Sequence, residues 1–170
     1  MAEIIGNRTI TKSKSEQKIN LRQLLGQKPS SSQIENFAKE AIEVINQRTL
    51  DGEDVDGKEF LPYSEEYARK KGVSTDSVDL FLTGDMLNSM DMTGSTRDTV
   101  SIGIIGGVEA KKSYYHNVDA PKKREFFGIT KNEAERIASK IKEEKKAEAP
   151  KAITLSELRR ALQLIDLGVE

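Results

Sequence analysis

The sequence predicts an α+β fold: a long N-terminal helix packed on a small antiparallel sheet, with further helices and extended terminal arms. Three observations lead to this prediction. Residues 34–45 carry an apolar stripe at the helical period, residues 100–104 alternate apolar and small residues as a strand does, and capping motifs begin further helices near residues 130 and 154. Both periodicities occur in one chain of 170 residues, a length suited to one domain.

The long helix is predicted over residues 32–48. Ser32, followed three residues later by Glu35, is typical of a capping box, in which each side chain satisfies a backbone amide of the first turn. Burying one large apolar side chain contributes roughly 1.5–3 kcal/mol, so this helix should be the principal packing element. Its apolar face is formed by Ile34, Phe37, Ala38, Ala41, Ile42 and Ile45.

A strand-to-helix corner and a hairpin are predicted in the middle of the chain. Residues 80–92, LFLTGDMLNSMDM, join an apolar extended piece to about one helical turn, with Gly84 at the bend. Residues 91–93 and 99–105 then read as two strands on either side of Gly94-Ser95. The second strand should bury one face, because its apolar residues alternate: Val100, Ile102 and Ile104.

The chain divides into three predicted parts. Residues 1–29 form an N-terminal arm with six basic and two acidic residues and few apolar anchors. Residues 30–146 form a single α+β core domain, and residues 147–170 a C-terminal linker and helix. The core domain ends in a helix that a capping box, Thr130 and Glu133, begins. The terminal helix spans residues 155–167 and should dock on its own domain or on a neighbour.

Composition excludes several kinds of chemistry. The chain has no cysteine, which excludes disulfides, thiolate catalysis and cysteine-bound metal. His116 is the single histidine, and beside two tyrosines it is expected to be structural. The net charge of −1 provides no overall field for nucleic acid or membrane, and no apolar run reaches 18 residues. We therefore expect no enzyme activity, no catalytic, cofactor-binding or metal-ligating residue, and no membrane partner.

Two motifs in residues 49–64 resemble ligand sites without satisfying them. Gly52, Gly57 and Lys58 have the spacing of a phosphate-binding loop, but Glu59 stands where Ser or Thr must hold magnesium. A calcium loop aligned on Gly57 would place Tyr63 at the bidentate carboxylate position. The segment is instead predicted to be an acidic turn without a cofactor.

Opposed charged segments are the candidate assembly interface. Residues 51–66 are strongly acidic and residues 111–124 are basic, and such complementary patches speed association and fix register. The apolar face of the terminal helix is expected to contribute to the same contacts. The candidate interface residues are Asp54, Asp56, Glu59, Lys111, Lys112, Lys122, Lys123, Arg124, Leu158, Leu162 and Ile165.

The order of these pieces resembles the tailed-phage virion morphogenesis proteins, which act in tail completion and head-to-tail joining. The resemblance covers about residues 34–129. It is carried by RTLDGEDVDGKEFLPYSEEYARKKG at 48–72, LTGDMLNSM at 82–90, VSIGI at 100–104, YYHN at 114–117 and REFFGIT at 124–130. Each piece is short, and the ordered set is more specific than any one of them.

The resemblance implies a structural ring subunit of the phage neck or tail end, and not an enzyme. It implies a hexameric or dodecameric ring that contacts the neighbouring connector, portal-side and tail proteins, with DNA only passing through the channel. The protein would be made in the host cytoplasm and reside in the virion. The alternative is a nucleic-acid-binding module that uses the basic arm, residues 1–29, and the patch at 111–124.

Overall fold

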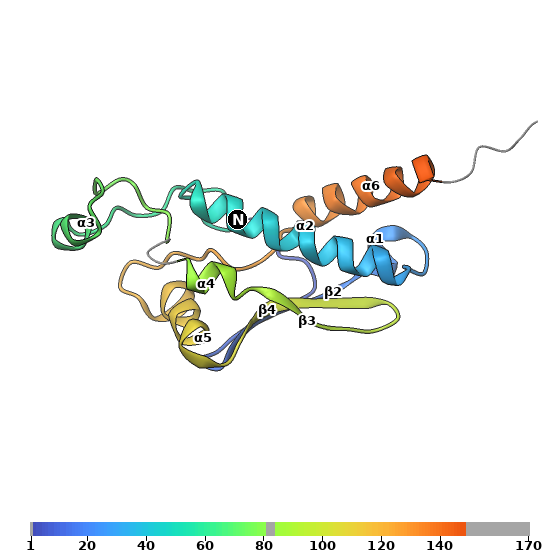
Figure 1. Ribbon diagram of the computed structural model, residues 1–170, viewed down its shortest axis with the longest axis horizontal. Coiled ribbons are helices and arrows are strands. Elements are labelled where there is room, and N and C mark those ends of the chain that lie inside the picture. Colours follow the sequence, from blue (N-terminus) through green and yellow to red (C-terminus); the bar gives the residue numbers. More distant parts are fainter. Residues whose placement is uncertain (1, 81–83, 149–170) are drawn as a thin grey trace, which may run out of the picture.

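A computed structural model describes residues 2–80 and 84–148 (Figure 1). The predicted α+β class is confirmed, since a long helix packs on an antiparallel sheet. The elements are β1 (Asn7–Ile10), β2 (Lys14–Asn20), α1 (Leu21–Leu25), α2 (Ser31–Leu50), α3 (Glu65–Lys71), α4 (Asp85–Asn88), β3 (Asp91–Ser95), β4 (Thr99–Ile105), α5 (Gly107–Tyr114), the π-helix η1 (Tyr115–Asp119) and α6 (Lys131–Glu148).

The sheet has four strands in the order β1-β2-β4-β3, and all neighbouring strands are antiparallel. Alternate residues of β2 and β4 face the helices and are fully buried, and they pair across the sheet: Ile19 lies opposite Val100, and Gln17 opposite Ile102. Helix α2 lies along this face, and α6 packs beside α2 (Figure 1). The core therefore lies between one face of the sheet and the helices.

The N-terminal segment is not an extended arm, and this expectation was wrong. Residues 7–20 form two strands of the sheet, and residues 21–25 form a helix that packs against α6. Ile19 and Leu21 are fully buried in the core. The pattern was missed because β2 buries polar residues: Ser15 shares a hydrogen bond with the Ser113 hydroxyl (2.7 Å), and Gln17 bonds the main chain of Ile129. Deleting residues 1–27 would thus remove two strands.

Helix α2 is longer than predicted and is capped elsewhere. The capping box consists of Ser30 and Gln33, not Ser32 and Glu35: the Ser30 hydroxyl accepts from the Gln33 amide (3.2 Å) and Gln33 accepts from the Ser30 amide (3.0 Å). Ser30 adopts the extended backbone that a cap requires, whereas Ser32 is already helical. The predicted stripe is buried except at Ile42, which is partly buried.

The second capping box is confirmed at the start of α6. The Thr130 hydroxyl accepts from the Glu133 amide (3.3 Å), and the Glu133 carboxylate accepts from the Thr130 amide (2.8 Å). The buried stripe of α6 is the predicted one: Ala134, Ile137, Ala138 and Ile141. The terminal helix predicted over residues 155–167 lies outside the described residues.

The hairpin turns later than predicted. Strand β3 continues through Gly94 to Ser95, with a bulge between Met92 and Gly94, and the turn falls at residues 96–98. The corner at 80–92 was predicted as buried, and the described part of it agrees. Helix α4 buries Met86 and Leu87, and its N-cap, Gly84, has a left-handed backbone (φ 79°).

Residues 124–130, which we call the central segment, run through the core without forming a strand. Phe126, Phe127 and Ile129 are fully buried. Because buried backbone groups must be hydrogen-bonded, side chains supply most of the partners of its middle, and the Ile5 amide also donates to the Ile129 carbonyl (3.3 Å). These side chains come from four parts of the fold. Arg48 donates to the Phe126 and Gly128 carbonyls, and Arg8 donates to the Phe127 carbonyl. Asn117 accepts from the Phe127 amide, and Gln17 bonds both the amide and the carbonyl of Ile129.

Replacing Gly103 in β4 by alanine should destabilise the fold. A Cβ there would overlap the Ser15 carbonyl oxygen of the paired strand and lie 2.9 Å from the Glu16 Cα, so backbone must move. We expect the free energy of unfolding to fall by about 1–3 kcal/mol, as for an overpacked core. The matched control is Gly94→Ala, where a Cβ meets nothing within 4 Å; it should change stability by less than about 0.5 kcal/mol in the same urea titration. Equal effects of the two variants would contradict the strand register.

Candidate functional site

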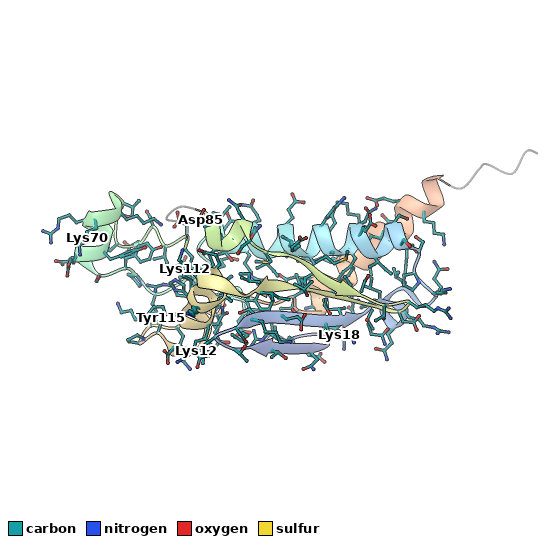
Figure 2. All side chains as sticks on the ribbon, turned by 60° about the horizontal axis from the view of Figure 1, so that its bottom comes forward. Lys12, Lys18, Lys70, Asp85, Lys112 and Tyr115 are labelled. Carbon is teal, nitrogen blue, oxygen red and sulfur yellow. The ribbon has the colours of Figure 1, made fainter. Side chains whose placement is uncertain are left out.

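The candidate site is a groove of about 710 Å³ between the α3 region, α4 and the α5–η1 turn. Its apolar lining includes Tyr63, Tyr67, Met86, Tyr115 and Pro121. Basic side chains line it as well: Lys112, Lys122 and Arg124. Figure 2 shows Lys112 and Tyr115 on the α5–η1 side, with Lys70 marking α3 on the other side.

One wall of the groove belongs to residues 52–79, which we call the excursion. Figure 1 shows that this part of the chain leaves the end of α2 and carries α3 well away from the sheet. Tyr63 organises it: its hydroxyl accepts from the Leu80 amide (3.2 Å) and from Lys71, which also pairs with Asp79. The centre of its ring lies 4.7 Å from that of Tyr67, four residues further along the chain.

Arg124 joins the excursion to the body of the protein. Its Nη2 donates to the Leu61 carbonyl (2.9 Å), and its guanidinium lies 5.1 Å from the centre of the Tyr63 ring. Arg124 is only 9% exposed, so it lines the groove from within rather than standing on an open basic surface; its part in an assembly interface stays a prediction. A main-chain hydrogen bond, from the Val55 amide to the Glu125 carbonyl (2.8 Å), also holds the base of the excursion.

His116 lies at the floor of the groove in the π-helical turn, partly buried. Its carbonyl accepts from the Arg124 amide (2.8 Å). Burial, and secondly the positive charge of Arg124, lower the pKa of His116 from 6.5 to about 4. The imidazole is therefore neutral at pH 7. No described residue forms a hydrogen bond with its Nδ1.

The other predicted interface residues are four lysines, three residues of the predicted terminal helix, and three acidic residues. Lys111, Lys112, Lys122 and Lys123 are exposed, and two of them already have partners: Lys112 pairs with Glu109 (2.9 Å), and Lys122 donates to the Pro62 carbonyl (3.3 Å). The predicted interface residues Leu158, Leu162 and Ile165 lie outside the described residues.

The acidic residues of the predicted interface serve their own loop in part. The Asp54 carboxylate accepts from the Asp56 amide (2.8 Å) and the Lys58 amide (2.9 Å), which is the geometry of a local turn. Asp56 accepts from the Ala2 amide (2.6 Å), and Glu59 is exposed. The Asp54 and Asp56 carboxylates are thus engaged within the chain, Asp56 also by an ion pair with Lys58 (3.4 Å), while Glu59 is exposed.

The chemistry of the groove is that of a binding surface. Aromatic faces and apolar side chains bury apolar groups, and the lysines and Arg124 attract anionic ones. In the described part of the chain, no three acidic or histidine side chains are placed to hold a metal ion. Over the same residues, no helix has the length and apolar character needed to cross a membrane. The sequence indicated the basic residues but not that they share one groove with Tyr63 and Tyr67.

No protein-family model matches the chain, and no curated protein or solved structure shows significant similarity to it.

The depressed pKa of His116 predicts a pH dependence of stability. The His116 imidazole takes up a proton near pH 6.5 in the unfolded chain and only near pH 4 in the folded chain. The stability that depends on the neutral imidazole is therefore complete above about pH 6.5 and is lost as pH falls toward 4. The loss should amount to at most about 3 kcal/mol. Urea unfolding across this range measures it against His116→Gln, which keeps all the carboxylates. If wild type and variant lose stability in parallel, His116 does not titrate with a shifted pKa.

Proposed function

We propose that this chain is a structural ring subunit of the neck or tail end of a tailed bacteriophage, where it acts in tail completion or head-to-tail joining. In this role it is not an enzyme. It assembles with copies of itself into a hexameric or dodecameric ring and contacts the neighbouring connector, portal-side and tail proteins. DNA only passes through the channel, and the protein resides in the virion after synthesis in the host cytoplasm.

The observation that carries the proposal is that the motifs of the resemblance contact one another. Arg48, the first residue of RTLDGEDVDGKEF, donates to the carbonyls of Phe126 and Gly128 in REFFGIT. Asn117 of YYHN accepts from the Phe127 amide (3.1 Å) in the same piece. Three of the motifs that carry the resemblance therefore meet in one buried part of the fold, which supports a shared architecture.

The surface also supports an assembly role. Exposed apolar side chains lie at several separate places, including Leu61 (52% exposed), Ile105 (58%) and Val108 (63%). Isolated exposed apolar residues are ordinary, but here Leu61, Tyr67 and Tyr115 belong to or adjoin one groove lined by lysines. An apolar surface with a charged rim is the usual composition of a protein–protein interface.

The nucleic-acid-binding alternative is weakened by the positions of the basic residues. The basic arm that it requires is part of the sheet, where Lys14 pairs with Glu16 (2.9 Å) and Arg8 with Glu125 (3.6 Å). Arg124 is buried against the excursion. Phosphate binding needs such cations to be unpaired and on one face, since the affinity comes from counterion release.

Assembly can be tested by mass. The chain, alone or with its partner, should sediment at several times 18.9 kDa, and the assembly should weaken at about 1 M salt, where charges are screened beyond about 3 Å. Lys122→Glu with Lys123→Glu should shift the equilibrium toward monomer, while Lys28→Glu serves as an exposed control away from the groove. A monomer at all concentrations, with salt-dependent DNA binding, would instead favour the alternative.

A further inference from the structure

We propose that the groove binds the C-terminal segment of a neighbouring copy of this chain, residues 155–167, with Asp166 facing the groove lysines. The inference rests on the proposed function, because it requires a neighbouring copy. It assigns to the ring a specific contact between a groove on one subunit and a segment on the next.

The groove is suited to an apolar segment that carries negative charge. Tyr67 and Tyr115 are 39% and 49% exposed and form an aromatic rim. Lys112 and Lys122 are exposed beside them, and Asp85 is the acidic residue among the described lining. Arg124 lies nine-tenths buried at the same groove, and no described residue accepts from its Nε. A buried donor of this kind favours an occupant with acceptor oxygens.

Residues 155–167 carry an apolar stripe throughout and negative charge in their C-terminal half. Arg159 and Arg160 balance Glu157 and Asp166 over the whole segment, so the complementarity to the lysines belongs to the half that contains Asp166. Leu158, Leu162 and Ile165 recur at the spacing of one helical face, so the segment has an apolar stripe to bury. From residue 161 onward the sequence ALQLIDLGVE contains Asp166 and Glu170 and no basic residue. The half that contains Leu162, Ile165 and Asp166 joins apolar side chains to a carboxylate and fits an aromatic groove edged by lysines, which is the helix-in-groove mode of recognition.

The positions of the two parts favour a neighbour over the same chain. Helix α6, from whose end the chain continues toward residue 155, ends at Glu148 on the far side of the molecule from α3 and α5 (Figure 1). Helix α2 lies between the end of α6 and the region of α3 and α5, and its 20 residues span about 30 Å. Residues 149–154 reach at most about 20 Å when extended. The predicted helix therefore begins short of its own groove, whereas its whole length can lie along the groove of a neighbouring copy.

Such a contact is head-to-tail, because it joins two different surfaces of identical chains. Contacts of this type continue from subunit to subunit and close into a ring when the rotation per subunit divides a full turn. The groove and the segment would then account for the self-association that the proposed function requires. They also explain why the groove walls come from well-anchored elements: Arg124 fixes one wall and the buried Asn117 the other.

Disulfide trapping tests the contact directly, since the full-length chain contains no cysteine. A chain with Tyr115→Cys is mixed with a chain with Ile165→Cys under mild oxidation. We expect a covalent dimer of the two different chains in high yield, and the chain carrying both substitutions should form a ladder of covalent oligomers. Tyr67→Cys provides a second groove position if the first variant does not fold. The control Lys18→Cys lies on the sheet away from the groove (Figure 2) and should give at least several-fold less product.

Charge reversal provides a second test of the contact. Lys112→Glu with Lys122→Glu should lower the yield several-fold, and Asp166→Lys should restore part of it, because each exchange reverses the sign of one side of the contact. A yield that is insensitive to all three substitutions would contradict the assigned pairing.

The outcomes separate this inference from the proposed function. An assembly of the expected mass that gives no groove-to-segment crosslink contradicts the docking alone. A disulfide formed within one chain shows that the segment folds back and also contradicts it, as does equal crosslinking of the Lys18→Cys control. A chain that remains monomeric and forms no crosslink contradicts both. An assembly that forms the mixed disulfide supports both.

Discussion

The fold depends on how the central segment, residues 124–130, satisfies its buried backbone. An irregular segment in a core lacks the regular main-chain hydrogen bonds of a helix or sheet, and each unpaired amide or carbonyl would cost about 1–3 kcal/mol of stability. Here Arg48, Arg8, Asn117 and Gln17 supply the missing partners from α2, β1, η1 and β2. Arg48 is itself paired with Glu133 (2.5 Å) at the start of α6, so the same interaction joins both long helices. Elements distant in sequence are thereby tied to one stretch of chain.

The groove is a consequence of this arrangement. Arg124 begins the central segment and bonds the excursion, while Asn117 connects the segment to the π-helical turn that bears Tyr115 and His116. Both walls are thus positioned by one buried, hydrogen-bonded segment. Interfaces whose parts are held before binding lose less conformational freedom on association, which is what the proposed ring contact would require.

Periodicity predicted what depends on apolar side chains and missed what depends on polar ones. The stripe of α2 and the alternation of Val100, Ile102 and Ile104 were sufficient to predict the helix and the buried strand face. Strand β2, KSEQKIN, has one apolar residue. Gln17 is buried in it because its side chain bonds the main chain of Ile129, which is distant in sequence. Similarly, charge alone assigned Arg124 to a surface, whereas its partners are carbonyls more than 60 residues away in sequence. Tertiary contacts of this kind leave no local pattern.

Amide hydrogen exchange tests the central claim most directly. The Phe127 and Ile129 amides donate to side-chain oxygens of Asn117 (3.1 Å) and Gln17 (2.7 Å) rather than to a neighbouring strand. If the central segment organises the fold, these two amides should exchange only on global unfolding, with protection equal to that of the Ile102 amide in β4. Exchange as fast as that of the exposed turn at residues 96–98 would show that the segment opens independently, and would contradict the account.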